Sequence, residues 1–280
     1  MAQARKKLAA ALAAAGKEPA TLESRHLLEE ATGLTPLVLS THAERRLGLG
    51  AATLLQQFAA RRLAGEPVSR ILGRSGFYGL DLRVDPEVLD PRADTETLVN
   101  AALAILEAKN IVRPRILDLG TGSGAILCAL LSCRDDAFGV GVDISPVACA
   151  ATHHNLTLCG LSQRSGVICG DWTEALQGHF DLIVSNPPYI ARREIAALEP
   201  EVAAFDPILA LDGGEDGLVP YRRIAPNLKR LLRQGGAACF EIGWRQASDV
   251  TFILEAEGFS QAKIFPDGGR RDRVVAIQAL

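Results

Sequence analysis

Apolar side chains in the first 65 residues recur at intervals of three and four, and no alternating pattern typical of strands appears there. This spacing predicts one helix that Gly16 can end, a second around 22–28, and a third from about 51 to 64 that stops at Gly65-Glu66-Pro67. Helices alone over this length predict a small helical bundle.

The pattern changes at Val68. Two short runs with glycines between them, 69–73 and 77–84, predict the strands of a β-hairpin, and 95–108 predicts a further helix. We therefore expect a helical domain at 1–67, a hairpin linker at 68–92 and a larger domain at 93–280, a division that suits a chain of 280 residues.

From Arg115 onward, short apolar runs alternate with helical stretches. Continuous apolar strands separated by helices indicate a sheet that is covered on both faces, hence a doubly wound α/β domain. The predicted strands are 116–119, 138–142, 166–169, 180–184, 237–242 and 273–277, and the predicted helices are 125–132, 146–158 and 173–176.

Composition narrows the class of protein. A formal net charge of −3 gives no overall electrostatic attraction to nucleic acid. None of the six cysteines belongs to a Cys-x-x-Cys pair, and Cys128 and Cys133 have no histidine or carboxylate at ligand spacing, so we expect neither a metal site nor disulfides. The chain opens without a signal-peptide pattern and has no apolar run long enough for a membrane span, which predicts a cytoplasmic protein.

A glycine-rich turn, Gly120-Thr121-Gly122-Ser123-Gly124, follows the strand predicted at 116–119. Ligands of open α/β sheets bind outside the carboxyl ends of the strands, and glycines let a ligand approach the main chain closely. The next strand ends at Asp143, which can accept hydrogen bonds from ribose hydroxyls or serve the start of the following helix. After the third strand, Asp171-Trp172 offers a carboxylate and a flat ring that suit adenine, although the ring is also ordinary core material.

The spacing of the glycines separates two kinds of nucleotide site. A dinucleotide site has Gly-x-Gly-x-x-Gly, whereas this turn reads Gly-x-Gly-x-Gly and no second nucleotide site follows. Adenosine without a pyrophosphate fits better, and the turn resembles that of class I methyltransferases, which implies S-adenosylmethionine as cofactor. The residues expected to bind it are Gly120, Thr121, Gly122, Ser123, Gly124, Asp143, Asp171, Trp172 and Asn186.

The most specific motif in the chain is Asn186-Pro187-Pro188-Tyr189, at the end of the fourth strand. Consecutive prolines fix the backbone, and the Asn186 side-chain oxygen and the Pro187 carbonyl can each accept one hydrogen of a planar –NH2 group. Asn-Pro alone is also a common start of a turn, but its place three strand units after the glycine turn favours a site. We expect Asn186, Pro187 and Tyr189 to be catalytic, and Pro188 to join them in binding the substrate.

The chemistry explains why hydrogen-bond acceptors are needed. An amide or exocyclic amino nitrogen is a poor nucleophile that gains positive charge in the transition state, so acceptors on its hydrogens stabilise that state more than the ground state. This scheme requires no strong base, and His153 and His154 lie on a predicted helix without a catalytic pattern. The motif therefore predicts methylation of a planar –NH2 group.

The chain resembles the release factor glutamine methyltransferases along nearly its whole length. This resemblance implies methylation of the side-chain amide of the glutamine in the Gly-Gly-Gln loop of class 1 peptide chain release factors, with the helical domain docking that protein. The chain departs from the family pattern at Asp90 and Ala93. The matching segments, beyond the turn and the motif named above, are 22–28, 65–67, 71–73, 77–80, 91–99, 142–145, 170–172, 211–218, 221–224 and 267–273.

Three alternatives stay open at this point. A glutamine methyltransferase acting on a ribosomal protein, or an adenine N6 or guanine N2 methyltransferase acting on nucleic acid, shares the motif chemistry. A base-flipping enzyme needs a basic groove and a recognition insertion, which the negative net charge fits poorly. A non-catalytic nucleoside-binding subunit is the third possibility. We expect a monomer with a protein substrate, no nucleic-acid substrate and no membrane partner.

Overall fold

The computed structural model describes residues 1–174 and 176–279. The chain forms two compact units, of which one comprises Met1–Arg74 together with Pro200–Phe205, and the other comprises Ser75–Glu199 and Asp206–Leu280. We call them the helical unit and the catalytic unit. The three-part division expected from the sequence, with boundaries after 67 and 92, stays a prediction.

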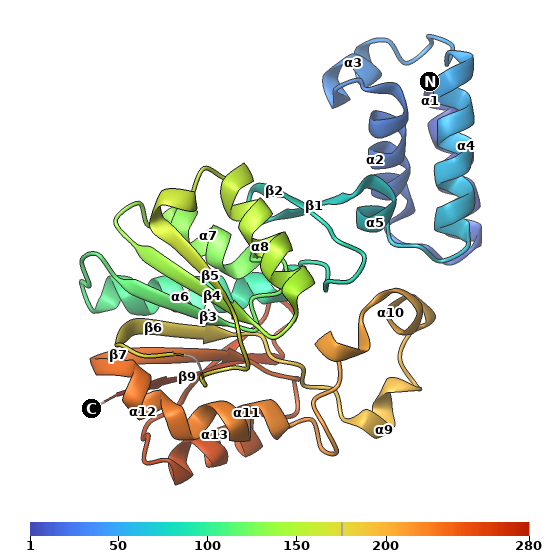
Figure 1. Ribbon diagram of the computed structural model, residues 1–280. Helices are drawn as coiled ribbons and strands as arrows, with labels where there is room; N and C mark the ends of the chain where they lie inside the picture. The colour runs from blue at the N-terminus through green and yellow to red at the C-terminus, as the bar shows by residue number, and fades with distance from the viewer. Residues whose placement is uncertain (175, 280) are drawn as a thin grey trace. The chain divides into compact units, whose positions relative to one another are not determined.

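The helical unit is a bundle around its own apolar core (Figure 1). Leu12, Leu27 and Leu28 are almost fully buried in that core, at positions that share one face of their helices. The helical pattern predicted for the first 65 residues is therefore confirmed. Its helices are α1 (Ala2–Ala14), α2 (Ala20–Thr32), α3 (Pro36–Thr41), α4 (Leu49–Leu63) and α5 (Val68–Leu72), with α10 (Pro200–Phe205) as a later addition.

The strand predicted at 69–73 is wrong, because this segment forms α5. Pro67 precedes the helix and Gly73 ends it in the left-handed conformation, with φ of 68°. The same Pro and Gly boundaries flank short strands, so a run of five residues does not distinguish the two structures. The hairpin begins one segment later, with β1 (Arg74–Phe77) and β2 (Leu80–Arg83).

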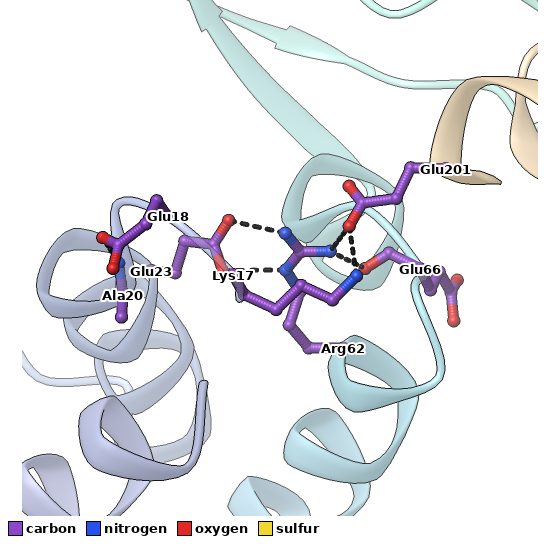
Figure 2. A network of polar contacts seen from close by, with 7 residues as sticks. All are labelled: Lys17, Glu18, Ala20, Glu23, Arg62, Glu66 and Glu201. Carbon is purple, nitrogen blue, oxygen red and sulfur yellow. Dashed lines mark hydrogen bonds and ion pairs between the residues drawn. The ribbon is translucent and has the colours of Figure 1, made fainter. Parts of the chain in front are cut away.

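A buried arginine joins α10 to the N-terminal helices (Figure 2). The Arg62 guanidinium donates to both carboxylate oxygens of Glu23 at 2.8 and 2.9 Å and to Glu201 at 2.8 Å. Lys17 forms an ion pair with the same Glu201 oxygen. These contacts explain why a six-residue helix from late in the chain belongs to the helical unit.

The catalytic unit contains a seven-stranded sheet in the order β5-β4-β3-β6-β7-β9-β8. All pairs from β5 to β7 are parallel, while β9 is antiparallel to both its neighbours. The predicted doubly wound α/β fold is confirmed. The strands are β3 (Arg115–Leu119), β4 (Phe138–Asp143), β5 (Ser165–Cys169), β6 (Phe180–Ser185), β7 (Leu232–Glu241), β8 (Lys263–Pro266) and β9 (Asp272–Gln278).

Helices cover both faces of this sheet (Figure 1). In β6, Leu182 and Val184 face one apolar cluster and Ile183 faces the other, as the two-residue period of a strand requires. The helix predicted at 173–176 includes Ala175, which lies outside the described residues. One face carries α6 (Glu96–Ala108), α7 (Ala125–Cys133) and α8 (Pro146–Leu158), and the other carries α11 (Val219–Ile224), α12 (Leu228–Leu231) and α13 (Ala247–Ala256). Shorter turns of helix are α9 (Arg192–Ile195), η1 (Ala93–Thr95), η2 (Ser162–Arg164), η3 (Ile208–Ala210) and η4 (Ala225–Asn227).

The strand order reverses between β3 and β6, and this switch point positions the site. Leu119 at the end of β3 pairs with Ser185 at the end of β6, so the glycine turn and Asn186 leave the sheet side by side. Ser185 in turn pairs with Phe240 of β7, which brings the end of β7 beside Asn186.

Candidate active site

A cavity of about 330 Å³ opens at the carboxyl edge of the sheet, within the catalytic unit. Pockets of this size and above accommodate small-molecule cofactors. Gly124, Pro187 and Tyr189 are absent from its wall, so the structure does not bring these three predicted site residues to the cavity surface. The predicted residues that do line it are Gly120, Thr121, Gly122, Ser123, Asp143, Asp171, Trp172, Asn186 and Pro188.

Gly120 allows the Trp172 side chain to lie against the main chain of the turn. A Cβ atom at position 120 would lie 3.1 Å from the indole ring, and the residue has φ of 70°. Gly124 has a different function, because its Cβ would lie 2.9 Å from the Thr152 side chain of α8. The first glycine therefore shapes the cavity, and the last one lets α7 and α8 approach each other.

Asp143 serves the start of the following helix, as its position suggested, and it also holds the glycine turn. One carboxylate oxygen accepts the Gly122 N–H at 2.9 Å, which holds the glycine turn. The other accepts the Ser145 N–H at 2.9 Å, and Ser145 caps α8. Burial raises the pKa of Asp143, whereas these backbone hydrogen bonds lower it. The carboxylate also lines the cavity, where its remaining lone pairs can accept hydroxyl hydrogens.

Asp171 and Trp172 follow β5 at the same edge of the sheet. One Asp171 oxygen accepts from Arg223 at 2.7 Å, while the other is buried without a hydrogen-bond partner among the described residues. Trp172 has φ of 45°, a conformation that non-glycine residues rarely adopt and that often marks a functional position. Arg223 lies on α11, 52 positions beyond Asp171, and was not among the predicted site residues, although it belongs to the matching segment 221–224.

The loop at 211–218 packs against the backbone at the end of the Asn-Pro-Pro-Tyr motif. Ile190 donates to Leu211 at 3.1 Å and accepts from Gly213 at 2.9 Å, forming a short parallel bridge. A Cβ atom at Gly217 would lie 2.4 Å from the Tyr189 carbonyl oxygen, so only glycine fits there. The motif is therefore fixed on a rigid support, and none of the residues of this loop was predicted to belong to the site.

The Asn186 side chain is oriented by a second residue that sequence reasoning missed. Its Nδ2 donates to the Thr95 hydroxyl at 3.2 Å. Thr95 is 5% exposed and lies in η1, before α6. Because the nitrogen side of the amide faces Thr95, the carbonyl oxygen is left to accept hydrogens from a ligand.

Two further buried carboxylates lie near the ends of strands. Burial raises the pKa of Asp118 to about 7, although the Thr121 hydroxyl donates to it at 2.7 Å. Burial also raises the pKa of Glu241 to about 7, although the Thr95 side chain lowers it. A carboxylate within an apolar strand was the signal that could have identified Glu241 in the sequence.

Within residues 1–174 and 176–279, no cluster of three or more histidine, cysteine, aspartate or glutamate residues could hold a metal ion. Over the same part of the chain, no helix has the length and apolar character needed to cross a membrane.

Two family models match the chain. The PrmC N-terminal domain matches residues 3–73, and the methyltransferase small domain matches residues 95–204. The second match contains the glycine turn and the Asn-Pro-Pro-Tyr motif.

Curated relatives match over most of their lengths. A release factor glutamine methyltransferase of Rhodospirillum rubrum is 47% identical over 262 residues, covering 94% of this chain and 80% of the relative. The enzyme of the same name from Bradyrhizobium diazoefficiens is 47% identical over 254 residues, covering 90% of this chain and 86% of the relative.

Among solved structures, the T. thermophilus 16S rRNA N2 G1207 methyltransferase, in complex with AdoMet and guanosine, aligns with a TM-score of 0.52. The alignment covers 74% of this chain and 50% of that one at 20% identity, so it supports the fold.

Proposed function

Since this chain belongs to the release factor glutamine methyltransferase family, we propose that it methylates the side-chain amide nitrogen of the glutamine in the Gly-Gly-Gln loop of class 1 release factors. The chain is an S-adenosylmethionine-dependent methyltransferase. The observation that carries the substrate chemistry is the orientation of Asn186, whose nitrogen faces Thr95.

The cavity fits the cofactor. Gly120 and Trp172 form a flat, apolar wall, and the unpartnered Asp171 oxygen beside it suits the amino edge of adenine. The Asp143 carboxylate suits the ribose hydroxyls. We propose that these residues, with the rest of the glycine turn, hold S-adenosylmethionine, which supplies an electrophilic methyl group on sulfur.

The acceptors act on the amide that receives the methyl group. We propose that the glutamine binds at the margin of the cavity, because Pro187 and Tyr189 lie outside its wall. There Asn186 Oδ1 and the Pro187 carbonyl each accept one hydrogen of the glutamine –NH2, Pro188 shapes the adjacent wall, and the Tyr189 ring contacts the amide plane. As the nitrogen bonds to the methyl carbon and the bond from that carbon to sulfur breaks, the nitrogen becomes more positive, so both acceptors hold its hydrogens more strongly until one leaves as a proton. The rigid support of the motif behind Ile190 keeps that geometry without rearrangement.

The test is transfer of labelled methyl from S-adenosylmethionine to purified release factor. We expect labelling that disappears when the loop glutamine is replaced by alanine. Asn186→Ala should reduce transfer by about a hundredfold or more, the scale of losing one transition-state hydrogen-bonding group, while cofactor affinity changes much less. Equal loss of both would contradict the role assigned to Asn186.

The alternative substrates are separate arms of the same experiment. Total ribosomal proteins, RNA and DNA are offered under identical conditions. Label on nucleic acid, or on a ribosomal protein in preference to release factor, would overturn the proposal. The net charge of −3 favours a protein substrate over nucleic acid. We also propose that the enzyme acts as a monomer in the cytoplasm. Light scattering at assay concentration tests the monomer.

A further inference from the structure

Three polar side chains lie in a line at the carboxyl edge of the sheet, and two of them, Thr95 and Glu241, are buried. Asn186 Nδ2 donates to the Thr95 hydroxyl at 3.2 Å, and the Thr95 side chain lowers the pKa of the Glu241 carboxyl group. They come from three separate elements, namely the end of β6, η1 and the end of β7. The pairing of Ser185 with Phe240 brings Asn186 and Glu241 to neighbouring strand ends.

The direction of each hydrogen bond follows from the groups present. Thr95 Oγ1 accepts from Asn186, which leaves its single hydrogen for the neighbouring Glu241 carboxylate, since an ionised carboxylate only accepts. The Thr95 oxygen is then restricted to accepting, and only the nitrogen side of the Asn186 amide can donate to it. The carboxylate thus determines, through one hydroxyl, which side of the amide faces the cavity.

Resting on the function proposed above, we propose that Glu241 is a positioning residue for methyl transfer, acting through Thr95 to present the Asn186 carbonyl oxygen to the reacting nitrogen. A negative charge at the far end of the line also polarises it. Hydrogen bonds in series strengthen one another, so the ionised carboxylate makes Asn186 Oδ1 a better acceptor as the substrate nitrogen becomes positive.

A buried carboxylate such as Glu241 lowers the stability of the fold, so a purely structural role does not explain its presence. The residue is 2% exposed, and its Oε2 is buried without a partner among the described residues. A buried carboxylate with an unsatisfied oxygen destabilises a fold unless other interactions compensate for it. Such strain is commonly retained where a charge serves the chemistry.

Charged and titratable groups surround Glu241 on several elements. Burial has the largest effect on the pKa of Glu241 and raises it to about 7. Arg273 and Arg92 lower this pKa, and Asp94 raises it. Tyr189 and Tyr221, whose own pKa values are raised mainly by burial, also face it. The line therefore changes its charge near neutral pH, and methyl transfer should weaken as the carboxylate becomes protonated.

The first test uses three variants and steady-state kinetics. Thr95→Val keeps the shape but removes the hydroxyl, and should lower kcat by about tenfold or more while cofactor affinity and KM for release factor change less than about threefold. Thr95→Ser, which keeps the hydroxyl, should restore most of the rate. The native enzyme should lose kcat as pH falls below about 7, and in Glu241→Gln this fall should disappear.

Thr251→Val is the matched control. It removes a buried hydroxyl in α13 that has no hydrogen-bond partner among the described residues, and it should leave kcat and its pH profile unchanged. Thermal unfolding of each variant separates loss of fold from loss of rate. A Thr95→Val enzyme with native kcat, or a Glu241→Gln enzyme with the native pH profile, would overturn the proposal.

A readout without substrate distinguishes this proposal from the proposed function. In ¹⁵N NMR spectra, the side-chain –NH2 resonances of Asn186 should shift with pH through about 7 in the native protein and stay fixed in Glu241→Gln. If release factor is not methylated but this titration is observed, the substrate assignment fails and the positioning line stands. If methylation occurs and the resonances do not titrate, the positioning role of Glu241 is overturned and the proposed function stands.

Discussion

Arg62 of α4 donates a hydrogen bond to Glu201 of α10 at 2.8 Å, joining residues that are 139 positions apart in the sequence. Arg62 is 4% exposed and also binds Glu23 through two hydrogen bonds, so its charge is fully paired inside the helical unit. The segment that follows the Asn-Pro-Pro-Tyr motif is thereby anchored at its midpoint. On either side of α10 in the sequence, Arg192 and Pro207 line the cavity.

We expect Arg62→Ala to destabilise the helical unit by about 3 kcal/mol, because it leaves the Glu23 and Glu201 carboxylates without their common partner. Urea unfolding followed by far-UV circular dichroism measures the change. Arg61→Ala is the control, since the Arg61 side chain is 43% exposed in its pair with Glu66 and should cost less than about 1 kcal/mol. Equal losses of unfolding free energy in the two variants would mean that the buried Arg62 network stabilises the protein no more than the exposed Arg61 pair.

The elements that the sequence predicted well are those determined by neighbouring residues. β6 is buried throughout and its apolar side chains alternate between two cores, and the glycine turn at 120–124 directly follows β3, so the local pattern was sufficient. The same local reasoning failed at 69–73, where Pro67 and Gly73 bound a helix but equally suit a strand. Short segments are decided by what they pack against, which a local pattern does not contain.

The support of the site was beyond sequence reasoning for a related reason. Thr95 is 91 positions from Asn186, and no pattern in either segment indicates that their side chains meet. The same holds for Glu201, whose helix belongs to a unit that otherwise consists of Met1–Arg74, more than a hundred positions earlier in the sequence. Glu241 was visible as a charge within an apolar strand, but its meaning depended on knowing which strands are neighbours.

We expect Gly217→Ala to impair methyl transfer more than cofactor binding. The added Cβ would lie 2.4 Å from the Tyr189 carbonyl oxygen and would displace the backbone of the motif. A loss in kcat of about tenfold or more is the scale for a displacement of this kind. Gly160→Ala is the control, because Gly160 has a similar φ of 72° but no atom within 4 Å of its Cβ. If both variants lose kcat equally, backbone strain and not the close contact is responsible.

We expect Trp172→Leu to weaken S-adenosylmethionine binding by about tenfold, the scale of losing one stacking surface for a base. Trp172→Phe keeps a ring and should retain part of the affinity. The chain has two tryptophans, so Trp244→Leu provides both a control for affinity and a protein whose fluorescence reports Trp172 alone. Titration calorimetry measures the affinities, and cofactor that quenches Trp244 instead of Trp172 would contradict the assigned wall.

Asp118 should make the unfolding free energy depend on pH in a direction opposite to that of most carboxylates. Its pKa in the folded protein is raised from 3.8 to about 7, mainly by burial. Between these values the folded state binds the proton and the unfolded state does not, so its contribution to stability is present at low pH and is lost as pH rises toward 7.

Asp118→Asn removes this dependence while its side-chain oxygen can still accept from Thr121. We expect the variant to match the native protein near pH 4 and to exceed it above pH 7 by on the order of 3 kcal/mol. Urea unfolding of the cofactor-free proteins at a series of pH values measures the difference. Asp136→Asn is the counterpart, because hydrogen bonds from Arg134 and the Arg113 backbone lower the pKa of Asp136 and its loss should cost stability as pH rises. An Asp118→Asn difference that stays constant with pH would show that this carboxylate is ionised throughout.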